Sequence, residues 1–130
     1  MKAVDTNILL RYIVRDHPEQ FNKAAAFLMA RTAGDPAYVS LIVVTELIWA
    51  LRRRYRYSRE DVHAVIAALL ETAELIFEDE LHLSALLANR PKGDIADHLI
   101  AFCAKRAECT TVVTFDRNAA KAIPSMELLS

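Results

Sequence analysis

The chain has 130 residues, the usual size of one domain with its own hydrophobic core. Sixteen basic residues nearly balance seventeen acidic ones, and the net charge of −1 excludes a general electrostatic attraction to nucleic acid or to membranes. No apolar run approaches the roughly 20 residues of a membrane span, and we expect no signal peptide before the first strand. The two cysteines lack a CxxC spacing, so we expect a reduced, cytoplasmic protein in which Cys103 is a small core residue.

Predicted strands and helices alternate along the whole chain, with no linker that would divide the single domain expected over residues 1–130. Strands are predicted at residues 2–4, 37–39, 75–77, 110–114 and 127–129. Helices are predicted at residues 8–13, 19–31, 41–55, 58–72, 78–90, 94–103 and 118–122, the second of them ending near Gly34. This alternation is typical of an α/β fold in which helices sandwich a central parallel sheet of about five strands. The first strand is too short to be stable at an edge, so we expect it to be paired on both sides.

Two acids follow directly after predicted strands. Asp5 follows the first strand, and Asp116 follows the strand at residues 110–114. Right-handed crossovers place all strand-to-helix turns of a parallel sheet on one edge, and this edge is where α/β proteins bind ligands. Asp is also a favoured N-cap and turn residue, so either acid taken alone could serve only to hold the next helix.

Two further acids lie on predicted helices. Glu46 interrupts a helix lined by Val, Leu, Ile and Trp, where a buried carboxylate would need a partner; alternatively, it belongs to a narrow polar stripe with Ala50 and Arg53. Asp97 follows Asp94 by three residues, a spacing that also imitates a capping box. Four carboxylates about 6 Å apart would repel by roughly 17 kcal/mol in total, more than the usual stability of a domain. A divalent cation would compensate, and oxygen ligands favour Mg²⁺ or Mn²⁺ over zinc.

Four short motifs follow one another with ordinary spacing. They are Val4-Asp5-Thr6-Asn7, Thr45-Glu46, Asp94-Ile95-Ala96-Asp97-His98-Leu99-Ile100-Ala101 and Val113-Thr114-Phe115-Asp116. In this order, and over nearly the whole chain, they resemble the motifs of PIN-domain ribonucleases, specifically the VapC toxins of VapBC toxin–antitoxin pairs. The resemblance implies a catalytic, metal-binding quartet of acids, an auxiliary acid and three polar supporting residues. The quartet is Asp5, Glu46, Asp97 and Asp116, the auxiliary acid is Asp94, and the supporting residues are Thr6, Asn7 and Thr114.

The same resemblance implies an activity and partners. It implies a Mg²⁺- or Mn²⁺-dependent endoribonuclease that cleaves structured RNA such as transfer RNA or ribosomal RNA. It also implies a homodimer and a small VapB-like antitoxin, assembled as a heterotetramer or a larger complex. The residues suit this chemistry, because metal-bound water can hydrolyse a phosphodiester without a covalent nucleophile.

Basic residues near the predicted site are candidates for RNA contact. The densest stretch interleaves arginines with two tyrosines, which would neutralise phosphates and stack on unpaired bases. Cations also suit the solvated C-terminal end of a helix, and the sequence does not separate the two roles. The candidates are Arg52, Arg53, Arg54 and Arg56 in this stretch, together with Arg11 and Arg15 on the helix after Asp5.

Two other functions are weighed against this reading. An aspartyl phosphotransfer module built on Asp5 would need a second Asp two residues later, where Asn7 stands. A receiver domain would need its Asp after the third strand, where Phe77 and Glu78 stand, and a Lys after the fifth. A catalytically silent PIN-like scaffold that binds a protein partner is disfavoured by the intact set of four acids.

Overall fold

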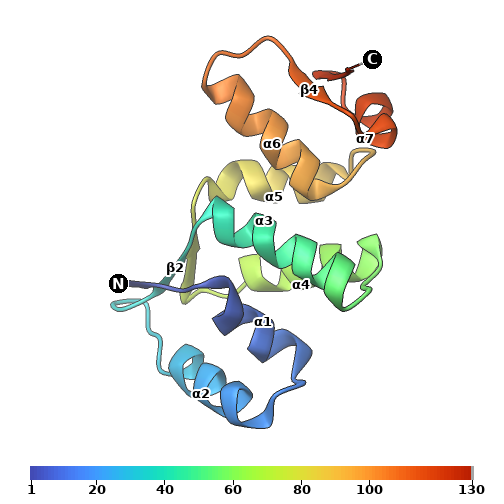
Figure 1. Cartoon of the computed structure of the whole chain (residues 1–130). Helices are drawn as coiled ribbons and strands as arrows, with labels where there is room; N and C mark the ends of the chain where they lie inside the picture. Colours follow the sequence, from blue (N-terminus) through green and yellow to red (C-terminus); the bar gives the residue numbers. More distant parts are fainter. Residues whose placement is uncertain (130) are drawn as a thin grey trace. The chain divides into compact units, whose positions relative to one another are not determined.

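A computed structural model describes residues 1–129, and the chain divides into two compact units, Met1–Ala85 and Leu86–Ser130 (Figure 1). The N-terminal unit contains β1 (Lys2–Ala3), α1 (Thr6–Val14), α2 (Pro18–Met29), β2 (Ala37–Val39), α3 (Leu41–Trp49), the π-helix η1 (Ala50–Arg54), α4 (Arg59–Leu70) and β3 (Leu75–Phe77). Helix α5 (Glu80–Asn89) crosses the boundary between the units. The C-terminal unit continues with α6 (Ile95–Arg106), β4 (Val112–Thr114), α7 (Arg117–Ala122) and β5 (Met126–Leu128). The predicted α/β class is confirmed, because helices alternate with strands that pair in parallel.

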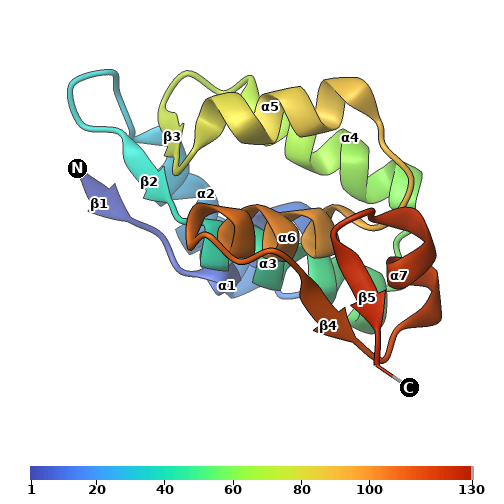
Figure 2. The same cartoon turned by 90° about the horizontal axis from the view of Figure 1, so that it is seen from above.

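The sheet of the N-terminal unit has the order β1-β2-β3, and its strands lie side by side in Figure 2. Strand β2 is central and its residues Ala37 and Val39 are fully buried, whereas Lys2 and Ala3 of β1 are exposed. The expectation that β1 is paired on both sides is therefore wrong for this sheet, where β1 lies at an edge. An exposed lysine is a common feature of edge strands, and the apolar residues of β2 suit the buried centre.

The C-terminal unit holds a second parallel sheet, formed by β4 and β5. The five predicted strands therefore all form, but their hydrogen bonds group them as three strands and two. Strand β4 begins at Val112 rather than at residue 110, because its partner β5 is only three residues long and pairs Val112 with Met126 and Thr114 with Leu128.

Two local predictions about helices need correction. Helix α2 ends at Met29 rather than near Gly34, because Thr32 and Asp35 pair in a tight turn that reverses the chain. Cys103 is exposed rather than in the core. Cys103 stands four residues after the buried Leu99 and so lies on the same side of α6, but that side is covered only in the first turns of the helix and is exposed at Cys103.

Large buried leucines form the centre of the N-terminal unit. Helix α1 contributes Leu9 and Leu10, and α3 with η1 contributes Leu47 and Leu51, all fully buried. Helix α1 packs against both α2 and α3. Among residues 1–129, no helix is long and apolar enough to cross a membrane.

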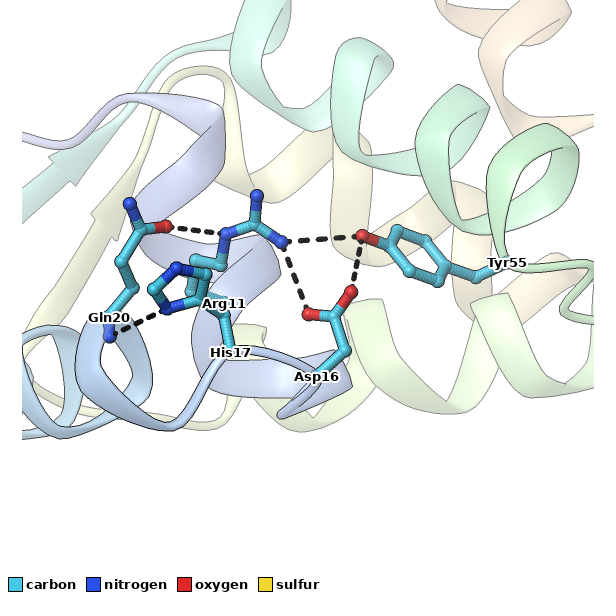
Figure 3. A network of polar contacts seen from close by, with 5 residues as sticks. All are labelled: Arg11, Asp16, His17, Gln20 and Tyr55. Carbon is cyan, nitrogen blue, oxygen red and sulfur yellow. Dashed lines mark hydrogen bonds and ion pairs between the residues drawn. The ribbon is translucent and has the colours of Figure 1, made fainter.

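A polar network joins α1, α2 and the end of η1 (Figure 3). Arg11 of α1 donates from Nε to Oε1 of Gln20 at 2.7 Å and from Nη1 to Oδ1 of Asp16 at 3.1 Å. Tyr55 donates its hydroxyl to Oδ2 of Asp16 at 3.1 Å, and Arg11 Nη1 reaches the same hydroxyl at 3.4 Å. The loop between α1 and α2 is thus tied to the residue that follows η1.

The network lowers the pKa of Asp16 below its ordinary value of 3.8. Partial desolvation raises this pKa, but four effects together lower it by more: the hydrogen bond from Tyr55, a backbone hydrogen bond, the charge of Arg11 and the hydrogen bond from Arg11. The carboxylate form of Asp16 is therefore the form that the fold favours.

Replacing Asp16 with Asn is expected to remove an acid-sensitive part of the stability. Between the folded pKa of Asp16 and about 4, the folded state binds fewer protons than the unfolded state, so its stability rises with pH. At neutral pH the wild type should have a higher urea midpoint than Asp16→Asn, and this difference should vanish in strong acid. Glu19→Gln, an exposed acid paired with Lys23, is the control and should show no such trend. A difference in urea midpoint between the wild type and Asp16→Asn that stays constant from neutral pH to about pH 2 would contradict a lowered pKa of Asp16.

Candidate metal and active site

Two of the predicted acids meet at one residue in the N-terminal unit. The Oδ1 atom of Asp5 accepts a hydrogen bond from the backbone N–H of Thr6 at 2.8 Å. The hydroxyl of Thr6 donates to Oε1 of Glu46, forty residues later in the chain, also at 2.8 Å. Thr6 is the first residue of α1, and Glu46 lies in the middle of α3, which packs against α1. The structure therefore joins the carboxylates of Asp5 and Glu46 to the same threonine.

Helix capping accounts for only part of the geometry of Asp5. A capping side chain usually accepts from the second or third amide of its helix. Asp116 does so, since its Oδ1 accepts from the N–H groups of Asn118 at 2.9 Å and Ala119 at 3.0 Å. Asp5 instead accepts only from the first amide of α1, that of Thr6. Its side chain is thus placed differently from that of an ordinary cap.

Glu46 is exposed, which corrects the expectation that it interrupts a buried surface. The apolar residues of α3 that enter the core lie on other sides of the helix, among them Leu47 and Ile48. Glu46 shares its exposed side with Trp49 and Arg53, whose guanidinium lies 5.7 Å from the centre of the Trp49 ring. Burial therefore gives no reason for a partner, and the hydrogen bond from Thr6 is what distinguishes this acid.

The C-terminal unit carries the other acids. Asp94 has the extended backbone of an N-cap, but its side chain makes no capping hydrogen bond to α6, so the capping-box alternative is not realised. Asp97 lies in the first turn of α6 and is half-buried. Residues three apart share a helix face, so the two acids lie on the same side of α6.

The turn before α6 is closely packed. Gly93 has a φ of +99°, and a Cβ atom there would lie 3.0 Å from the Cβ of Ala122, so a glycine is needed for both reasons. The Nε2 atom of His98 lies 2.6 Å from the carbonyl oxygen of Lys92. These contacts fix where α6 begins, and hence where Asp94 and its neighbours lie within this unit.

Thr114 supports Asp116 directly. Its hydroxyl accepts from the backbone N–H of Asp116 at 3.0 Å, at the point where β4 ends. Thr6 instead donates its hydroxyl to the carboxylate of Glu46. A supporting role of either threonine at a metal site stays a prediction. Asn7, in contrast, is exposed and makes no side-chain hydrogen bond within residues 1–129.

Three of the acids share a pattern that suits metal binding. Asp5, Glu46 and Asp116 each use one carboxylate oxygen to accept hydrogen bonds, and within the described chain the other oxygen has neither a donor nor a cation beside it. Ligating carboxylates are typically oriented by such hydrogen bonds, which leave the second oxygen for the ion. An all-carboxylate donor set fits Mg²⁺ or Mn²⁺.

Neither unit completes a metal site by itself. Among the described residues, no three His, Cys, Asp or Glu side chains of one unit lie together as a metal-binding group. The structure joins Asp5 to Glu46 in the N-terminal unit and places Asp94, Asp97 and Asp116 in the C-terminal unit. The meeting of all four quartet acids stays a prediction.

The arginines proposed for RNA contact have different surroundings. Arg11 is held in the network of Figure 3, and Arg15 lies over the rings of Tyr12 and Phe21, at 5.9 and 4.8 Å from their centres. Arg52 is half-buried and donates to the backbone carbonyl of Tyr57 at 3.1 Å. The remaining three are exposed: Arg53, Arg54 and Arg56. RNA contact by any of them stays a prediction.

The sequence analysis did not predict a role for Glu78 at the edge of the sheet. Its Oε1 accepts from the backbone N–H of Leu41 at 2.9 Å, while Ser40 caps the same helix through Val43. Glu78 directly follows β3, so a third carboxylate lies at the carboxyl edge of the N-terminal sheet. The signal that could have found Glu78 is its position directly after a strand, the same signal that singles out Asp5.

Comparison with known proteins places this fold and these acids in a family. The model of the PIN domain family matches residues 2–123, so the chain belongs to the PIN domain family. The chain is also similar to a VapC ribonuclease of Aquifex aeolicus (strain VF5). The two are 25% identical over 119 residues, which cover 90% of this chain and 88% of the relative. The resemblance found in the four motifs is thereby confirmed.

Proposed function

We propose that this protein is a metal-dependent endoribonuclease and the toxin of a toxin–antitoxin pair. The observation that carries the proposal is that Asp5 and Glu46 both hydrogen-bond to Thr6, because two exposed carboxylates bound to one residue can serve together as ligands of a divalent cation. Membership of the PIN domain family and the similarity to a VapC ribonuclease support the same conclusion. The chain then works as one PIN domain over residues 1–130.

In this proposal four acids hold Mg²⁺ or Mn²⁺, with Asp94 as an auxiliary. The four are Asp5, Glu46, Asp97 and Asp116. When bound, the ion lowers the pKa of a water molecule and neutralises charge on a phosphodiester. The chain contributes the orientation of the ligands: Thr6 holds one oxygen of Glu46, and the second and third amides of α7 hold one oxygen of Asp116. No side-chain nucleophile is required.

The proposed substrate is structured RNA, such as transfer RNA or ribosomal RNA, met in the cytoplasm. A net charge of −1 gives no global attraction to RNA, so binding must depend on a local basic surface. The exposed arginines after α3, Arg53, Arg54 and Arg56, are the best placed for phosphate contact. Arg53 and Arg54 lie on the helical run that carries Glu46, and Arg56 follows its end, so the arginines and Glu46 are close in sequence within the N-terminal unit.

Removal of any quartet acid is expected to abolish cleavage. Asp5→Asn, Glu46→Gln, Asp97→Asn and Asp116→Asn should each lower the cleavage rate of total RNA by about 100-fold or more, the usual effect of losing a group that stabilises transition-state charge. Mn²⁺ should raise the melting temperature of the wild type and have less effect on Asp5→Asn, since an ion stabilises only a protein that binds it. Gel analysis of RNA and thermal unfolding measure the two effects.

Two exposed acids outside the proposed site provide matched controls, Glu71→Gln in the N-terminal unit and Glu127→Gln in the C-terminal unit. Both should cleave RNA like the wild type. Cleavage that persists in excess chelator would refute the dependence on metal. A protein that binds Mn²⁺ but never cleaves RNA would favour the alternative of a catalytically silent scaffold.

We also propose a small VapB-like antitoxin as partner, bound to a homodimer of this chain in a heterotetramer or a larger complex. Expression of this chain alone should arrest growth, and coexpression with the short open reading frame beside its gene should restore growth and yield a copurifying complex. The mass of that complex, measured by light scattering, reports the stoichiometry. Growth arrest that the neighbouring gene does not relieve would contradict the partnership, whereas failure of RNA cleavage would contradict the nuclease.

A further inference from the structure

The two helices that carry Asp5 and Glu46 are tied together at two separate places. The first tie is the hydrogen bond from Thr6 to Glu46. The second is the network at the other end of α1, in which Tyr55, directly after η1, meets Arg11 and Asp16 (Figure 3). Helices α3 and η1 are consecutive, so the second tie acts on the helical run that holds Glu46.

The second tie is a closed ring of contacts. Asp16 accepts from Arg11 with Oδ1 and from Tyr55 with Oδ2, and Arg11 also reaches the hydroxyl of Tyr55. Arg11 is further held by Gln20 of α2. The guanidinium, the carboxylate and the phenol ring are each planar, and a charged donor and acceptor strengthen the bonds. The ring therefore fixes the orientation of α1 relative to the end of η1, as well as the distance between them.

Two separated ties limit motions that one tie would allow. Along its own axis, α1 rises by about 7 Å between Thr6 and Arg11, and the α3–η1 run rises by about 13 Å between Glu46 and Tyr55. A single tie at Thr6 would leave α1 free to pivot on α3. The leucines between the helices resist separation, but hydrophobic contact has no preferred direction and resists sliding and rotation less.

The π-helix gives Tyr55 its place in the ring. The backbone N–H of Tyr55 bonds to the carbonyl oxygen of Ala50 at 3.2 Å, a span of five residues rather than four. A wider turn changes the side of the helix from which the following side chain leaves. Short π-helical turns of this kind occur frequently at functional sites. Here the turn directs the Tyr55 hydroxyl to Asp16 (Figure 3).

We infer that Tyr55, with Arg11 and Asp16, is a positioning clamp that keeps α1 and α3 in the register at which Asp5 and Glu46 bind a divalent cation. The inference rests on the proposed function, in which these two acids are metal ligands. Tyr55 acts through the helices and does not touch either carboxylate. The clamp also gives Arg11 a role within the fold rather than on the RNA.

Removal of one oxygen atom tests the clamp with little risk to the fold. Tyr55→Phe should weaken Mn²⁺ binding by about 10-fold, since residues that orient metal ligands usually contribute 10- to 100-fold in affinity. Calorimetric titration with MnCl₂ measures this without reference to activity. Cleavage by Tyr55→Phe should fall at limiting Mn²⁺ and recover at saturating Mn²⁺, with an unchanged KM for RNA, which a general loss of structure would not produce.

Tyr12→Phe is the matched control. It removes the same hydroxyl oxygen from a tyrosine of α1, and within the described residues that hydroxyl makes no hydrogen bond. It should bind Mn²⁺ like the wild type. Equal Mn²⁺ affinities for Tyr55→Phe and the wild type would overturn the clamp, provided that Asp5→Asn weakens binding.

If Asp5→Asn binds Mn²⁺ normally, the proposed metal site fails, and a metal-free readout decides on the clamp. Hydrogen exchange of the amides of Thr6, Asn7 and Ile8 should be faster in Tyr55→Phe than in Tyr12→Phe, because α1 would pivot more freely. Equal exchange in the two variants would overturn the clamp independently of the metal.

Discussion

The hydrogen bond from Thr6 to Glu46 is the interaction on which the proposed chemistry depends. It spans forty residues of sequence and brings a carboxylate of α3 to the residue that follows Asp5. Two carboxylates bound to one residue can serve together as ligands of a cation, and the other oxygen of each accepts no hydrogen bond within the described residues. Without this bond, the fold would offer two separate surface acids, which are common and carry no chemistry.

Parallel strands supply the positions for these groups. In the N-terminal sheet, each strand is followed at its carboxyl end by a polar residue that bonds to the start of a helix: Asp5 after β1, Ser40 after β2 and Glu78 after β3. Asp116 follows β4 in the same way. A side chain at such a point is held by backbone amides on one side and remains accessible on the other, and α/β proteins use this edge for ligands.

Much of this arrangement can be predicted from local sequence rules. The order of strands and helices and the cap at Asp116 follow from patterns a few residues long, and such a pattern also singled out Glu46. The reason given for Glu46 was nevertheless wrong, because an apolar helix can still present one side to solvent, and periodicity did not show which side. The edge position of β1 could not be predicted from the residues of β1 alone. It depends on which strand occupies the buried centre of the sheet, and that strand is β2.

The clamp around Tyr55 lay beyond sequence rules for a clear physical reason. Its members come from α1, from the loop before α2 and from the end of η1, and a π-helical turn redirects one of them. Sequence periodicity describes regular helices, so it cannot show a change of helical pitch. In the sequence, the arginines beside Tyr55 suggest contact with RNA phosphates. In the structure, the hydroxyl of Tyr55 donates a hydrogen bond to Asp16.

The most direct test of the central claim is a crystal structure with Mn²⁺, in which anomalous scattering locates the ion. The account predicts an ion bound by Asp5, with Glu46, Asp97 and Asp116 as ligands or one water away and with the Thr6 hydroxyl still on Glu46. An ion bound elsewhere, or Glu46 turned away from Asp5 in the occupied crystal, would contradict it.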